Sequence, residues 1–182
     1  AGLIQVSTPD IQPVGQLSTT YQAQHPTIGT AHQLQFEVGL TPSFAIAIYQ
    51  GLSPAQTMTN VELNLYRRNS FYISAGYLGT DDADIYQPFI EAGFHTERDD
   101  LVVGIQRQHG TNSAIMGFGR RIAPSVTVQA DYISGTSVSS LLAAGLVFDI
   151  GAHVSVNPAI FLRNSDHRAF GFFSITWEAQ VW

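Results

Sequence analysis

The sequence contains no cysteine and no lysine, and few of its residues are charged. Only 12% of the 182 residues are Asp, Glu or Arg, compared with roughly 25% charged residues in soluble globular chains. Soluble sheets commonly carry lysine at exposed strands as protection against aggregation, whereas all eight basic residues here are arginine. The outer surface of a water-soluble barrel would therefore be short of charge. The absence of cysteine suits exported and cytosolic proteins alike and identifies no compartment.

Long hydrophobic runs and basic clusters are also missing. The longest apolar run extends from Leu141 to Phe148, far short of the roughly 18 residues of a membrane helix. A formal charge of −6 without basic clusters excludes a typical nucleic-acid-binding surface. The six histidines lack the spacing of a metal site. The sequence thus indicates no cofactor, no metal and no nucleic-acid partner.

The chain does contain short segments in which apolar and polar residues alternate. The clearest has Val61, Leu63 and Leu65 on one face, and a period of two defines a β-strand. Because alternation does not say which face is outside, the charge deficit is what places the apolar face outward. We predict an all-β, up-and-down antiparallel transmembrane barrel over residues 14–182, with about twelve strands and ten as the alternative. The expected strands are 14–24, 31–40, 44–50, 57–66, 70–78, 85–95, 101–108, 114–121, 125–134, 140–150, 153–163 and 169–182.

Two kinds of connection alternate between these segments. Very short turns alternate with longer stretches rich in Gly, Ser and Asp, including 50–56 and 109–113. Outer-membrane barrels have short periplasmic turns at one rim and longer loops at the other. Pro88 and Pro158 fall within strands, where a missing N–H predicts bulges. Residues 1–13 are interpreted as a periplasmic arm or a partial plug, with a disordered terminus as the alternative.

These features together resemble the bacterial outer-membrane β-barrel superfamily. Barrels of that superfamily usually end on an aromatic residue that recruits the barrel assembly machinery, and Trp182 is similar to that signal. The pattern departs from the signal at Thr176, Glu178 and Gln180, which share the parity of Trp182 but are polar. The resemblance implies an outer-membrane location and contact with membrane lipid. The opening residues Ala1-Gly2-Leu3 suit a start after a small-residue cleavage site, so we expect a mature exported chain from which a signal peptide has been removed.

Charged residues of polar-face parity are the candidate site. Four glutamates lie at similar depth counted from the short-turn ends, and rings of charged side chains set ion selectivity in pores. Positive residues of the same parity could instead pair with them and close the lumen. The expected constriction consists of Glu37, Glu62, Glu91, Glu178, Arg121 and Arg163, with His95 as a further positive candidate. Small inward residues such as Gly104, Gly117 and Gly119 favour a narrow open pore.

The predicted function is passive passage of small polar or cationic solutes. One alternative is a non-conducting barrel that serves as a scaffold in an export or adhesion assembly. A second is a lipid hydrolase. His109, Thr111 and Asn112 resemble the His-x-Ser-Asn stretch of outer-membrane lipid hydrolases, and His109 and Thr111 share the lipid-facing parity of Val103 and Ile105. A soluble ligand-binding barrel is the third.

Overall fold

The computed structural model describes residues 3–6, 11–80, 86–108 and 110–182. Twelve strands make up the regular structure of these residues. The strands are β1 Gln16–Gln24, β2 His32–Thr41, β3 Phe44–Leu52, β4 Ala55–Arg68, β5 Phe71–Thr80, β6 Tyr86–His95, β7 Asp99–Gln108, β8 Thr111–Ala123, β9 Val126–Ile133, β10 Leu141–Ile150, β11 Val154–Arg163 and β12 Ala169–Gln180.

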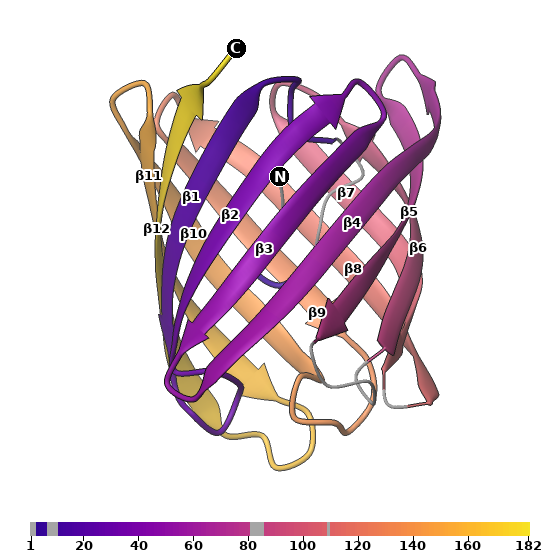
Figure 1. The fold of residues 1–182 in the computed structure, drawn as a ribbon. Helices are drawn as coiled ribbons and strands as arrows, with labels where there is room; N and C mark the ends of the chain where they lie inside the picture. The colour runs from indigo at the N-terminus through magenta and orange to yellow at the C-terminus, as the bar shows by residue number, and fades with distance from the viewer. Residues whose placement is uncertain (1–2, 7–10, 81–85, 109) are drawn as a thin grey trace.

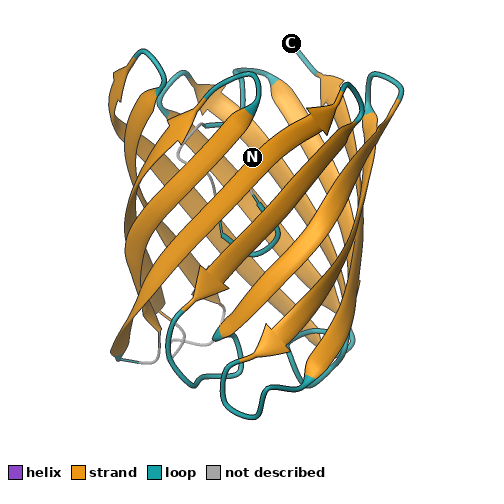
Figure 2. Cartoon of the chain, turned by 180° about the vertical axis from the view of Figure 1, so that it is seen from behind, coloured by secondary structure: helices purple, strands orange, loops and turns teal. Residues whose placement is uncertain are grey.

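The strands form one closed, antiparallel barrel. Each strand pairs with its neighbours in the chain, and β1 closes the ring by pairing with β12 from Gln16 opposite Gln180 to Gln24 opposite Phe172. Figures 1 and 2 show the tilted strands from opposite sides as a continuous wall. Closure leaves no unpaired sheet edge, which is the condition for a sheet to lie in lipid. The predicted fold class and the count of twelve strands are confirmed.

The connections differ between the two rims, although less sharply than expected. The rim with the turns 42–43, 69–70, 96–98, 124–125 and 151–153 is called the short-turn rim, and the opposite one the loop rim. Two predicted loops are short as well, because β3 and β4 extend until only residues 53–54 lie between them, and β7 and β8 leave only 109–110. The loops 25–31, 134–140 and 164–168 are longer, as expected.

Irregularities in the ladder lie elsewhere than predicted. Register shifts occur beside Leu40, Leu65 and Ile122, close to the short-turn rim. Pro88 and Pro158 keep regular register with β5 and β12, so the predicted bulges are wrong. The missing N–H instead interrupts pairing on the other side, since neither proline has a partner in β7 or β10. A proline can therefore remove a ladder bond without shifting the register.

The outer face of the barrel is apolar and the inner face is mostly polar. Along β7, Leu101 and Val103 are 54% and 51% exposed, whereas Val102 between them is 1% exposed. Large apolar side chains are similarly exposed on the other strands, for example Phe36, Ile90 and Ile160. Water would penalise such a surface at roughly 25 cal/mol per Å² of apolar area, whereas lipid would not. Within the described ranges, no helix is long and apolar enough to cross a membrane.

Described residues near each end of the chain contact the barrel. Ile4 and Val6 are buried among inward-facing side chains of the strands, so residues 3–6 lie in the lumen. After β12, the Val181 N–H donates to the Gly15 carbonyl at 2.7 Å. Trp182 follows outside the strand and is exposed, so its parity is not continuous with that of β12.

Candidate functional site: the barrel lumen

A cavity of about 590 Å³ occupies the lumen. Inward side chains of β12, β1, β2 and β4 form one side of it, and we call this side the polar wall. Its members are Ser18, Thr20, Gln22, Gln33, Gln35, Glu37, Asn60, Glu62, Ser174, Thr176 and Glu178. They face inward because alternate residues of a strand share a face. Hydroxyls, amides and carboxylates therefore line the space that a solute would cross.

Glu37 and Glu178 lie in one row of the sheet. Both pair across the ladder with Ser18, which stands between them on β1. The Gln16 amide donates to Glu178 Oε2 at 2.8 Å, and the Gln35 amide donates to Glu37 Oε2 at 3.3 Å. Amide donors from β1 and β2 thus orient both carboxylates. The two side chains therefore flank Ser18, with strand β1 between them.

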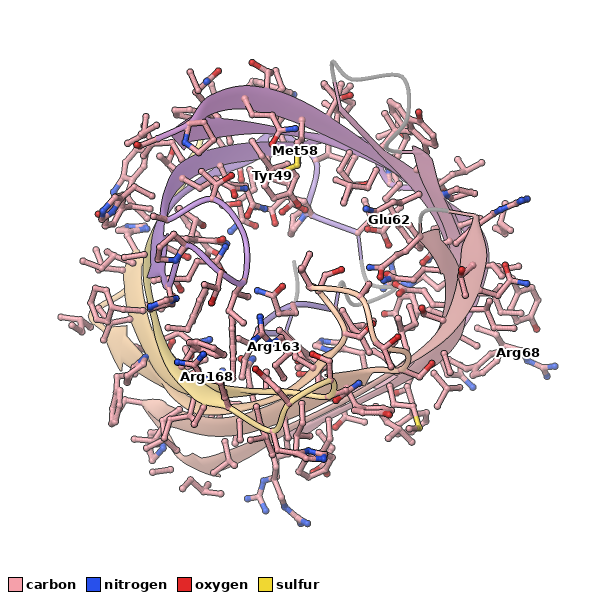
Figure 3. The ribbon with its side chains drawn as sticks, turned by 90° about the horizontal axis from the view of Figure 1, so that it is seen from below. Tyr49, Met58, Glu62, Arg68, Arg163 and Arg168 are labelled. Atoms are coloured by element: carbon pink, nitrogen blue, oxygen red, sulfur yellow. The ribbon has the colours of Figure 1, made fainter. Side chains whose placement is uncertain are left out.

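Glu62 extends this carboxylate group onto β4. Figure 3 shows Tyr49, Met58 and Glu62 inside the ring of strands and Arg68 outside it. The Tyr49 side chain hydrogen-bonds with Asn60 and lies within electrostatic reach of both Glu37 and Glu62. On the intervening strand β3, only the small side chains of Ala47 and Ala45 stand opposite the two glutamates. The lumen is therefore acidic on the alternate strands β12, β2 and β4.

Glu91 occupies a different environment from the other three glutamates. It is 2% exposed on β6, and the Ser74 hydroxyl donates to its Oε1 at 3.2 Å. It faces inward but does not border the cavity that Glu37, Glu62 and Glu178 line. A Cβ on the neighbouring Gly104 would lie 2.8 Å from the Glu91 Cβ, so this carboxylate is packed against the wall.

The candidate positive residues lie at the rims. Arg121 is near the short-turn rim, where its guanidinium is 4.0 Å from Asp149, and it borders a smaller recess that Glu178 also reaches. His95 pairs with Asp100 at the same rim. Arg163 lies at the loop rim, where it binds Asp166 and stacks over Phe170. The predicted constriction therefore separates into acidic residues within the lumen and ion pairs at its two ends.

Solved outer-membrane proteins have a similar architecture. The KdgM porin superposes with a TM-score of 0.61 at 10% sequence identity, and the match covers 89% of this chain and 98% of the porin. The NanC porin gives a TM-score of 0.56 at 10% identity, covering 90% and 98%. Outer membrane phospholipase A from Escherichia coli gives 0.52 at 10% identity, covering 92% and 98%. No protein-family model matches the sequence, and no curated protein matches it significantly.

The chain has the fold of the outer-membrane β-barrel superfamily. Porins and an enzyme share this fold, so the superfamily does not decide the activity by itself. The residues that line the lumen and those on the outer wall therefore bear on function more than the fold does.

The outer wall gives little support to the hydrolase motif. His109 lies outside the described residues. Thr111 pairs with Gln108 and shares the inward parity of Ser113, whereas Asn112 pairs with Arg107 on the outward face. The lipid-facing parity predicted for Thr111 is therefore wrong, because the turn after Gln108 resets the alternation. Thr111 and Asn112 do not face a common site in lipid.

Sequence reasoning missed two features of the lumen. One is Asp131, an inward carboxylate on β9 that is 2% exposed; its parity with Gln129 was the available signal. The other is a group of inward apolar residues on β7–β12. Val102, Ile115, Ile133, Leu141 and Phe161 all have the polar-face parity of their strands, which a closer reading of each strand could have found. Among the described residues, no group of three His, Asp or Glu side chains is arranged to hold a metal ion.

Proposed function

We propose that the barrel is a passive pore for small polar or cationic solutes. The observation that carries the proposal is the lining of the main cavity, in which Glu37, Glu62 and Glu178 are the charged side chains and no Arg or His takes part among the described residues. Carboxylates in a narrow lumen with low-dielectric walls attract cations and repel anions. The amides of the same wall both donate and accept hydrogen bonds, which suits uncharged polar solutes.

The positive residues support a selective lumen over one closed by salt bridges. Arg121, His95 and Arg163 each pair with an aspartate near a rim. None of these three residues lines the main cavity. The charged side chains on the polar wall of the cavity are therefore carboxylates.

A structural neighbour offers a contrast in charge. The KdgM porin has been solved in complex with oligogalacturonate, whose sugar units carry carboxylates. The cavity of the present barrel is itself lined by carboxylates, and like charges repel in a medium of low dielectric constant. We therefore expect this barrel to disfavour acidic oligosaccharides and to prefer cations or neutral solutes.

The test is ion selectivity of the purified protein in a planar bilayer. In a salt gradient the wild type should show a reversal potential of cation-selective sign. Changing Glu37, Glu62 and Glu178 together to Gln keeps side-chain size and removes three charges, so the reversal potential should move towards zero. Glu97→Gln is the matched control, because Glu97 is exposed in a short turn outside the cavity.

Two outcomes would contradict the proposal. Equal reversal potentials for the wild type and the triple variant would show that these carboxylates do not select ions. Absence of any conductance from correctly folded protein would favour the non-conducting scaffold, an alternative that the presence of residues 3–6 in the lumen keeps open.

A further inference from the structure

One side of the lumen is lined by apolar side chains, whereas the rest of the lining is mostly polar. Inward side chains of β7–β12 form what we call the apolar wall, which consists of Val102, Ile115, Ile133, Leu141, Ala143, Ala159, Phe161, Phe170 and Phe172, all at most 8% exposed. The rings of Phe161 and Phe172 stack with centroids 4.8 Å apart. The inner face of a water-filled barrel is expected to be polar. An apolar wall in a lumen needs a cover that keeps water away from it.

Residues 3–6 provide part of this cover. Ile4 is buried in the cluster formed by Leu141 and Phe161, together with Ile28 from the β1–β2 loop. Val6 is buried in the cluster of Val102, Ile115 and Ile133, and Leu3 packs against that second cluster. A segment of four residues thus spans two apolar patches of the wall. We call this segment the strap.

Asp131 holds the backbone of the strap. Its Oδ2 accepts hydrogen bonds from the Gln5 N–H at 2.7 Å and from the Val6 N–H at 3.2 Å. Within the strap, the Leu3 N–H donates to the Val6 carbonyl at 2.9 Å, which closes a turn. Hydrogen bonds to an ionised acceptor contribute more than neutral ones. One oxygen of this buried carboxylate is therefore satisfied by the strap backbone.

The wall is also shaped to admit the strap. A Cβ built on Gly117 would lie 2.2 Å from Leu3 Cδ1, and one built on Gly119 would lie 3.2 Å from Leu3 Cδ2. Any larger residue at position 117 would displace the Leu3 side chain. The small inward residues that predicted an open lumen thus accommodate the strap at this place.

We propose that the strap is a resident partial plug that docks on the apolar wall, is held there by Asp131, and narrows the pore from the side of β7–β12. The apolar contacts and the hydrogen bonds to Asp131 act together, so weakening either one should release the strap from the wall. Release should widen the conducting path and leave the carboxylates of the polar wall in place. The effect on conductance depends on the proposed pore function, whereas docking of the strap does not.

Thiol accessibility measures docking directly. Because the chain has no cysteine, Ile4→Cys introduces a single reactive thiol in the full-length protein. In detergent or vesicles, this thiol should react with a water-soluble cationic methanethiosulfonate much more slowly than Thr136→Cys, a control in an exposed loop. Adding Asp131→Ala should raise the Ile4→Cys rate by about tenfold or more, since two charge-assisted hydrogen bonds are lost. Asp149→Ala, which removes an aspartate near the short-turn rim, should leave the rate unchanged.

Conductance is the second readout. Asp131→Ala, and separately Ile4→Asn with Val6→Asn, should increase single-channel conductance without changing the reversal potential. The double asparagine variant changes the strap and leaves the wall intact. It therefore tests whether release of the strap raises conductance even if Asp131→Ala does not fold. Equal thiol reactivity at positions 4 and 136 in the wild type would overturn the proposal, as would unchanged Ile4→Cys protection in Asp131→Ala. If no variant conducts, the pore function fails while the thiol rates still report on the strap.

Discussion

Arginine placed on the outward face of β7 should distinguish a membrane barrel from a soluble one. This face has Asp99 at the short-turn end, then Leu101, Val103 and Ile105, and then Arg107 at the loop end. The three apolar residues are 51% to 55% exposed. In water, Val103→Arg would be harmless or favourable. In lipid, the same change would place a charge where no polar partner exists.

The structure gives the expected magnitude. Asp99 and Arg107 are eight positions apart, which is about 27 Å along a strand at ~3.4 Å per residue. At a strand tilt of about 35–45° this becomes about 19–22 Å of height, close to the ~25 Å apolar band of such barrels. Val103 lies midway, where arginine costs about 2–4 kcal/mol. Leu101 lies nearer the native charge, where the cost falls to about 0–1 kcal/mol.

The assay is reversible urea unfolding in lipid vesicles, followed by tryptophan fluorescence and by heat-modifiable gel mobility. Val103→Arg should lower the folding equilibrium constant about 30- to 900-fold, at tenfold for each ~1.36 kcal/mol. Leu101→Arg should change it much less, and Gln129→Arg, which puts the charge on the inward face, should be tolerated. Equal stability of Val103→Arg and the wild type would refute membrane residence. So would protein that stays soluble and monodisperse without detergent.

Two further predictions concern the lumen and the loop rim. Phe161→Ala removes a fully buried ring that stacks on Phe172 and should destabilise the barrel by about 3–5 kcal/mol in the same urea titration. At the loop rim, the hydrogen bond from Arg163 lowers the pKa of Asp166 to about 2. Because the pKa in the folded protein lies below the ordinary value, the ionised Asp166 stabilises the fold at neutral pH. This contribution is lost as the pH falls towards 2. Carbon-13 NMR titration of Asp166 should show this depressed value in the wild type and a return to the ordinary range in Arg163→Ala.

Local sequence patterns predicted most of the fold. The twelve alternating segments gave all twelve strands with ends within a few residues, because a strand with one face in lipid needs an apolar residue at every second position. The errors lie at strand ends and at the two prolines. At strand ends, the hydrogen-bonded ladder continues beyond the last residue of the apolar pattern. Thus β4 continues to Arg68, although the pattern ends near Tyr66.

The site was less predictable because depth and contact depend on the whole barrel. Parity placed Glu37, Glu62, Glu91 and Glu178 on the inward face, but parity is a property of one strand. Whether a side chain borders the cavity, as Glu62 does, or packs against the wall, as Glu91 does, depends on neighbouring strands. The strap depends on contacts between Val6 and Asp131, which are 125 positions apart, and no local pattern contains that information.

If the barrel conducts as proposed, the division of its lumen into two walls should let the width of the pore and its ion selectivity vary separately. A pore lined evenly by charge would change both properties with every substitution. Here the residues expected to select ions lie on β2, β4 and β12, whereas the segment expected to limit width docks against Asp131 and the apolar residues of β7–β12. Neutralising the glutamates should therefore change the reversal potential at nearly constant strap protection, and releasing the strap should change conductance at nearly constant reversal potential. A variant of Asp131 that altered conductance and reversal potential to the same extent would place this carboxylate on the conducting path itself. The strap would then not limit the width of the pore.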